Sequence, residues 1–154
     1  GRNAVHLAEL GYEVVALDGS KQGAEKTLAL AEQRGVTVET VTADLANYVF
    51  EPASWMGIVS IFCHLPAELR TLVHRGIVTG LAPGGTLLVE AYTPAQLALG
   101  TGGPPVLEML YTLDALRSEL AGLDLQVARE LERDVTEGRF HTGRAAVVQI
   151  VGRR

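Results

Sequence analysis

The sequence contains a single cysteine, Cys63, among its 154 residues. An internal disulfide and a zinc site built from several thiolates are therefore excluded, and we expect a reducing, cytoplasmic environment. Basic residues are not in excess, because 13 Lys and Arg stand against 18 Asp and Glu. A nucleic acid is therefore not expected as a partner.

No apolar run approaches the ~20 residues that span a bilayer, and the four histidines are too far apart in sequence for a local metal motif. Neither a membrane nor a metal is expected.

Segments with strand-like apolar runs alternate with segments of helical spacing. We expect helices at residues 2–10, 20–34, 66–80 and 112–122, and strands at 12–17, 36–42, 58–62, 86–91, 125–134 and 145–151. This alternation predicts an α/β, Rossmann-like fold: a mainly parallel sheet with helices on both faces. The last two strands are expected to form a C-terminal antiparallel hairpin. Residues 1–154 are expected to form a single domain.

Acidic residues follow the first two expected strands, where open α/β sheets bind their ligands. Asp18-Gly19-Ser20 closes the first strand, and a carboxylate there can accept hydrogen bonds from both ribose hydroxyls; the alternative is that Asp18 only caps the next helix. Asp44 repeats the arrangement one strand later, next to Leu45, and can accept from the amine of adenine. Its alternative is a turn aspartate. Gly1 fits a turn where the backbone approaches a ligand closely, or a residue left by cloning.

A second group of candidates follows the later strands. His64 and His141 are the candidate catalytic bases, because an unperturbed imidazole titrates near ~6.5. The alternatives are a His64 ring bonded to the backbone and a His141 in a solvated hairpin tip. Tyr92, Tyr111 and Arg133 are expected to line a substrate pocket. The Gly- and Pro-rich residues 100–105 are expected to close over it.

Five segments, in chain order, resemble the motifs of a known family: Gly1-Arg2-Asn3-Ala4, Val14-Val15-Ala16-Leu17-Asp18, Ala43-Asp44-Leu45, Ile58-Val59-Ser60-Ile61-Phe62-Cys63-His64-Leu65 and Leu81-Ala82-Pro83-Gly84-Gly85-Thr86-Leu87-Leu88. The family is the class I S-adenosylmethionine-dependent methyltransferases, and the chain is most similar to the tellurite-resistance-type or small-molecule branch. The resemblance covers essentially the whole chain.

This resemblance implies S-adenosylmethionine as the cofactor. It would place Asp18, with Gly19 and Ser20, at the ribose, Asp44 and Leu45 at the adenine, Gly1 at the methionine end, and Phe62 beside the methyl group. Two departures stand out. Met56-Gly57 occupies a position where the family usually has an acidic residue, and the first strand with most of the glycine-rich turn is missing before Gly1.

In the family, the missing strand is central, between the strands that end at Asp18 and Phe62. Its removal would leave buried backbone groups without partners, at ~1–3 kcal/mol each. We therefore expect an N-terminal extension, or another chain that fills the slot.

The leading hypothesis is in-line methyl transfer from S-adenosylmethionine to a small-molecule acceptor, by a monomer or a homo-oligomer. A second hypothesis is a degenerate, non-catalytic binding or scaffold domain that kept the fold and lost the cofactor. A nicotinamide-dependent oxidoreductase shares the acidic strand end, but the expected antiparallel hairpin disfavours it.

Overall fold

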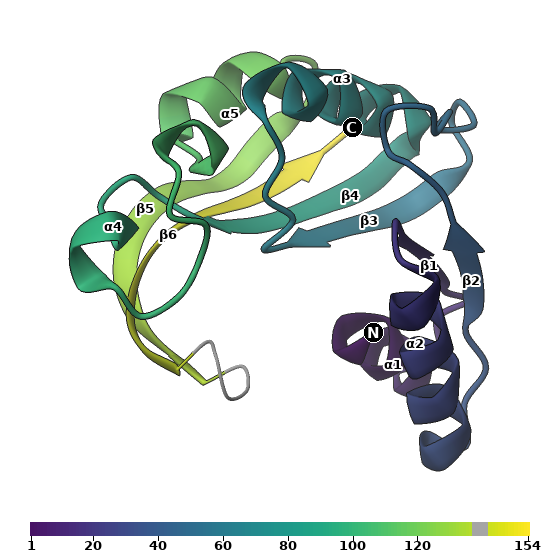
Figure 1. Cartoon of the computed structure of the whole chain (residues 1–154). Helices are drawn as coiled ribbons and strands as arrows, with labels where there is room; N and C mark the ends of the chain where they lie inside the picture. The colour runs from purple at the N-terminus through teal and green to yellow at the C-terminus, as the bar shows by residue number, and fades with distance from the viewer. Residues whose placement is uncertain (137–141) are drawn as a thin grey trace. The chain divides into compact units, whose positions relative to one another are not determined.

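The computed structural model describes residues 1–136 and 142–154. They form two compact units, Gly1–Tyr48 and Val49–Arg154, and each is described by itself (Figure 1). Within the described ranges, no helix has the length and apolar character needed to cross a bilayer.

The first unit contains two helices and a two-stranded parallel sheet. Its elements are α1 (Arg2–Glu9), β1 (Val15–Asp18), α2 (Lys21–Arg34) and β2 (Glu39–Thr42). Strands β1 and β2 pair in register, with Asp18 opposite Thr42. The core is built from Val5, Ala31 and Val38, with half-buried apolar residues packed around them. Both strands are shorter than the apolar runs that predicted them.

The helix ends of this unit confirm the expected signals. The Ser20 side chain accepts a hydrogen bond from the Gly23 N–H at 3.3 Å and so caps the N-terminus of α2. Gly35 ends the same helix in the left-handed conformation, with φ of 68°. A side chain would be strained there, which is why glycine is favoured at this position.

The second unit contains a four-stranded mixed sheet in the order β3-β4-β6-β5. Its elements are β3 (Trp55–Ile61), α3 (Ala67–Gly80), β4 (Leu81–Tyr92), α4 (Gln96–Leu99), the short 3-10 helix η1 (Leu107–Met109), α5 (Leu113–Glu119), β5 (Asp124–Thr136) and β6 (Thr142–Arg153). Strands β3 and β4 are parallel, whereas β6 is antiparallel to both β4 and β5. Helices α3 and α5 lie over the same face of this sheet (Figure 1).

The α/β fold and the C-terminal antiparallel hairpin are confirmed. The hairpin pairing runs from Asp124 opposite Arg153 to Thr136 opposite Thr142. Among the described residues, two strand pairings are parallel, β1 with β2 and β3 with β4. The other two, β4 with β6 and β5 with β6, are antiparallel. The candidate base His141 lies outside the described residues.

Strands β1 and β3 each lie at an edge of their sheet. Among the residues described, β1 pairs only with β2, and β3 pairs only with β4. The expected N-terminal extension stays a prediction.

Candidate active site

The ends of β1 and β2 place Asp18 at the edge where a ligand of this sheet would bind. The Ala43 N–H donates to the Asp18 carbonyl oxygen at 3.1 Å, which continues the pairing beyond the strands. The half-buried Asp18 carboxylate accepts from the Ser20 N–H at 2.8 Å. A Cβ on Gly23 would lie 2.1 Å from Oδ2 of Asp18. Glycine in the first turn of α2 is therefore what lets the carboxylate rest against the helix.

Asp44 follows the neighbouring strand and is exposed. Its carboxylate accepts from the Ala46 N–H at 2.9 Å and from the Asn47 side-chain amide at 3.3 Å. These contacts are those of a turn aspartate. Leu45 is half-buried beside it. The expected adenine contacts of Asp44 and Leu45 stay predictions.

Gly1 is in close contact with helix α2. A Cβ at this position would lie 2.2 Å from Oγ1 of Thr27. Thr27 is buried, and its hydroxyl donates to the Gly23 carbonyl at 2.9 Å, so it cannot easily move away. The close approach of α1 to α2 thus favours glycine here, independently of any ligand.

Four of the candidate residues of the second unit form one aromatic cluster. The Phe62 and Tyr92 rings stack with centroids 4.5 Å apart, and the His64 and Tyr92 rings stack at 5.5 Å. The Tyr111 ring meets His64 edge-on at 5.3 Å. Phe62 directly follows β3 and has a φ of 52°, which is unusual for a bulky residue. The sequence therefore identified residues that do come together.

The His64 ring is held by the backbone on both sides. Its Nδ1 lies 2.8 Å from the Met109 carbonyl oxygen. Because a carbonyl only accepts, Nδ1 carries the proton and Nε2 carries the lone pair. The Tyr92 N–H points at Nε2 from 3.4 Å. This is the backbone-bonded arrangement that the sequence left open as the alternative to catalysis.

Tyr111 bonds to the segment that follows β3 through its hydroxyl. The hydroxyl donates to the Cys63 carbonyl and accepts from the Leu65 N–H at 3.2 Å. Burial is the main cause that raises the pKa of Tyr111 well above its usual range. The phenol therefore stays protonated at neutral pH.

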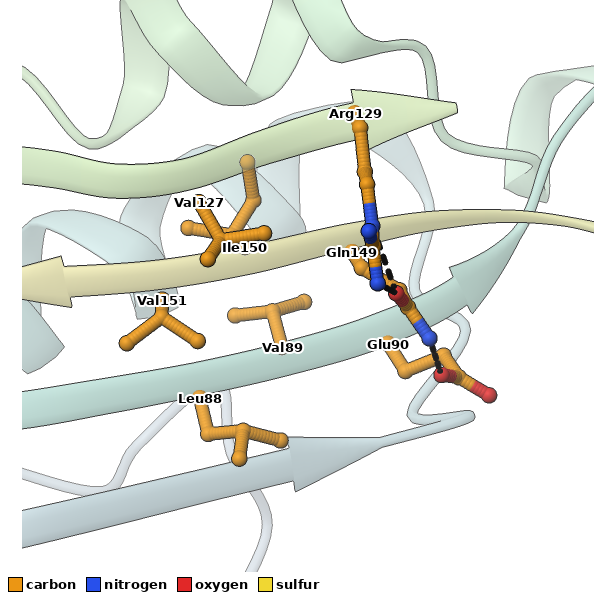
Figure 2. A pocket seen from close by; sticks show the side chains of 8 residues that line it. All are labelled: Leu88, Val89, Glu90, Val127, Arg129, Gln149, Ile150 and Val151. Atoms are coloured by element: carbon orange, nitrogen blue, oxygen red, sulfur yellow. Dashed lines mark hydrogen bonds between the residues drawn. The ribbon is translucent and has the colours of Figure 1, made fainter. Parts of the chain in front are cut away.

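Arg133 is paired with Glu90. Its Nε donates to the buried Glu90 carboxylate at 3.1 Å. Gln149 also donates to Glu90, and Arg129 donates to Gln149 at 2.9 Å, which makes a polar row across β4, β6 and β5 (Figure 2). Glu90, Arg129 and Gln149 border a cavity of about 240 Å³, which is smaller than the roughly 300–1,000 Å³ of most small-molecule pockets.

The Gly- and Pro-rich loop at residues 100–105 is tied to β6. The buried Gln96 side chain donates to Thr101 Oγ1 at 2.9 Å and to the Gly102 carbonyl at 3.1 Å. Its oxygen accepts from the Ala146 N–H at 2.9 Å. Thr101 also donates to the Arg144 carbonyl at 2.6 Å. Closure of this loop over a substrate stays a prediction.

The sequence reasoning missed a buried charge cluster formed by Arg70, His74 and Glu119. The Glu119 carboxylate accepts from Arg70 at 2.8–3.0 Å and from His74 Nδ1 at 2.7 Å. Burial alone would raise the pKa of Glu119, but the hydrogen bonds from His74 and Arg70 outweigh it and lower the pKa to about 2. Arg70 and His74 are four residues apart on the buried face of α3. Their spacing on the otherwise apolar face of α3 was the feature of the sequence that could have indicated a buried polar cluster.

No group of three or more His, Cys, Asp or Glu side chains is arranged to hold a metal ion in the described ranges.

Three solved structures illustrate the similarity of the fold. TehB from Haemophilus influenzae has a TM-score of 0.76 at 18% identity, over 100% of this chain and 54% of that one. An S-adenosylmethionine-dependent methyltransferase from Methanosarcina mazei has a TM-score of 0.71 at 15% identity, over 97% and 85%. The cyclase SpnF has a TM-score of 0.74 at 13% identity, over 100% and 70%. At these identities the similarity shows the fold alone.

A comparison with curated protein sequences found no match. A comparison with family patterns did find one: residues 1–85 match the family described as "Methyltransferase domain". The match includes both acidic strand ends, the segment after β3 and the turn at Gly84-Gly85. Since it spans more than half of the 154 residues, this chain belongs to the methyltransferase-domain family.

Proposed function

We propose that the chain is an S-adenosylmethionine-dependent methyltransferase that acts on a small-molecule acceptor. The observation that carries the proposal is the paired ends of β1 and β2, which bring Asp18 and Asp44 to one edge of a parallel sheet. Family membership supports the reaction type. The small-molecule branch is supported by the sequence resemblance described above.

The residues at this edge fit an adenosine group. An ionised carboxylate offers about four lone-pair sites, and Asp18 uses one for the Ser20 N–H. Sites therefore remain for two ribose hydroxyls, next to Gly19, which has no side chain. We assign the ribose to Asp18 with Gly19 and Ser20, the adenine to Asp44 and Leu45, and the methionine end to the region of Gly1.

S-adenosylmethionine, when bound, supplies a sulfonium methyl group that is already electrophilic. The protein then mainly has to orient the acceptor, and orientation alone can lower a barrier by ~7–11 kcal/mol. We assign Phe62 to the methyl side, and Tyr92, Tyr111 and Arg133 to the acceptor side.

The described candidates for a general base are already engaged. His64 keeps its proton on Nδ1 against Met109, its Nε2 faces the Tyr92 N–H, and Tyr111 stays protonated. This arrangement favours a soft acceptor, such as a thiol or a metalloid oxyanion, which needs little help from a base. His141 is the second candidate base, for a hydroxyl or amine acceptor.

Methyl-labelled S-adenosylmethionine, offered with thiol, metalloid-oxyanion, amine and hydroxyl acceptors, tests this proposal. We expect label in the thiol or oxyanion product, and less than a threefold change in turnover for His64→Ala and His141→Ala between pH 6 and 9. Transfer confined to amines or hydroxyls, with turnover lost in either histidine variant, would contradict the base-free mechanism. No transfer to any acceptor would contradict the proposed enzyme.

A non-catalytic binding domain is the second candidate function. Met56, at a position where the resembling family usually has an acidic residue, is 68% exposed in β3. A folded chain that binds neither S-adenosylmethionine nor S-adenosylhomocysteine is the outcome that this candidate predicts.

Gly23 allows cofactor binding to be separated from stability. Alanine has a higher helix propensity than glycine by about 1 kcal/mol, but its Cβ would occupy the place of the Asp18 carboxylate. We expect the free energy of unfolding of Gly23→Ala to lie within about 1 kcal/mol of the wild-type value. We expect its affinity for S-adenosylmethionine to be about tenfold weaker. Urea unfolding and calorimetry measure the two effects. Wild-type affinity in this variant would contradict the role of the Asp18 position.

A further inference from the structure

We infer that the buried charge cluster of Arg70, His74 and Glu119 acts through Tyr111 as a positioning device for residues 62–65, the segment after β3. The inference rests on the proposed function, which places this segment beside the reacting methyl group. The four residues follow the carboxyl end of a strand, where ligands of such sheets bind.

All four residues of the segment are held by hydrogen bonds to other parts of the second unit. The Phe62 N–H donates to the Glu90 carbonyl at 2.7 Å, and the His64 ring donates to the Met109 carbonyl at 2.8 Å. The Tyr111 hydroxyl bonds to both the Cys63 carbonyl and the Leu65 N–H. A single phenol thus connects two alternate residues of the segment and fixes the backbone between them.

The charge cluster fixes the Tyr111 ring from the other side. The Arg70 guanidinium lies 4.7 Å from the centroid of the ring, in cation–π range, and the His74 ring meets it edge-on at 6.0 Å. Glu119 holds both of these groups, and the side chains of Arg70, His74 and Glu119 are only 8%, 2% and 9% exposed. The carboxylate therefore fixes the positions of the guanidinium and the imidazole, and these two groups fix the position of the Tyr111 ring.

The backbone of the segment gives a reason for such support. Phe62 is held at a φ of 52° although it is neither glycine nor asparagine. Strained backbone persists only where the surroundings determine it strongly, and it is concentrated at functional sites. Without Tyr111, we expect the segment to relax into several conformations, which would misplace Phe62 and His64.

Cys63, the only cysteine of the chain, is a probe inside this segment. Its reaction rate with a soluble aromatic disulfide can be measured on the full chain under native conditions, at several low urea concentrations. We expect Tyr111→Phe, which removes only the hydroxyl, to raise the rate at least tenfold. That rate should be nearly independent of urea, because a local opening exposes little new surface. Glu119→Gln is expected to raise it about threefold.

The matched control is Tyr12→Phe, the same change at a 64% exposed position in the first unit. It should leave the labelling rate unchanged. An unchanged labelling rate in Tyr111→Phe would overturn the inference. A faster rate that rises with urea as steeply as global unfolding does would also overturn it, because it would show that Tyr111 only stabilises the fold as a whole.

Calorimetry with S-adenosylhomocysteine then connects the segment to the cofactor. We expect Tyr111→Phe to bind it about fivefold more weakly than the wild type and Tyr12→Phe to bind it equally well. Equal affinity in Tyr111→Phe, despite faster labelling, would overturn the connection. A wild-type chain that fails to bind would instead contradict the proposed function, while the labelling result still decides whether Tyr111 anchors the segment.

Discussion

Replacing Asp18 by alanine is expected to weaken S-adenosylmethionine binding by about 100-fold or more. Each hydrogen bond to a charged group contributes about 1.5–3 kcal/mol, and we assign two ribose hydroxyls to this carboxylate. The loss of both corresponds to at least 3 kcal/mol, or about two orders of magnitude in Kd. Calorimetric titration of the wild type and the variant measures it.

Two further variants make the result specific. Asp18→Asn keeps the size and one acceptor oxygen but loses the charge, so an intermediate affinity is expected. Asp114→Ala removes an exposed carboxylate from the first turn of α5 and should leave binding unchanged. Since Asp18 also accepts from the Ser20 N–H, its loss should cost about 1 kcal/mol of stability, the usual net contribution of one hydrogen bond. Binding is therefore compared well below the melting temperature. An Asp18→Ala protein with wild-type affinity would remove the basis of the ribose assignment.

The largest effect on stability is expected at Glu119. Removing one partner of a buried ion pair leaves an uncompensated charge and typically costs about 3–5 kcal/mol. Glu119→Ala would leave Arg70 and His74 without their shared carboxylate in a nearly closed site. Against a total stability of ~5–15 kcal/mol, this loss is large. Urea unfolding at pH 7 measures it. Glu132→Ala breaks the exposed pair with Arg144 and is the control, with an expected loss below about 1 kcal/mol.

The same carboxylate predicts an acid-sensitive component of stability. The folded pKa of Glu119 is about 2, below its ordinary value of 4.5. A lowered pKa stabilises the fold above pH 4.5, and this contribution is lost as the pH falls from 4.5 towards 2. The difference corresponds to on the order of 3 kcal/mol. Arg70, His74 and Thr71 all donate to this group. Glu119→Gln should therefore show a shallower loss of stability over this range, and equal slopes would contradict the assignment.

The features that could be predicted from the sequence are set by residues close together in the chain. Ser20, Gly35 and Thr112 act as caps as expected, because a cap contacts residues only a few positions away. The β5–β6 hairpin follows for a similar reason. The strand bounds were less accurate: β1 and β2 are shorter than their apolar runs, since strand length depends on pairing with a distant segment.

The site could be predicted only in part for the same physical reason. Position after a strand was enough to select His64 and Tyr92, and the fold brings them together with Tyr111. It gave no indication that the His64 ring bonds to Met109, 45 residues away. The Arg70–Glu119 pair is 49 residues apart, and the polar residues on the apolar face of α3 do not indicate which carboxylate they contact. Arg133 lies in the strand expected at residues 125–134, but its pairing with Glu90, 43 residues away, could not be predicted from its neighbours in the chain.

The central claim is that the acidic strand ends bind an adenosine cofactor that donates a methyl group. Its most direct test is a calorimetric titration of the chain with S-adenosylmethionine, with NADH in a parallel experiment. We predict a single micromolar site for S-adenosylmethionine, occupied equally well by S-adenosylhomocysteine, and no heat of binding with NADH. Binding of NADH with no response to S-adenosylmethionine would contradict the account.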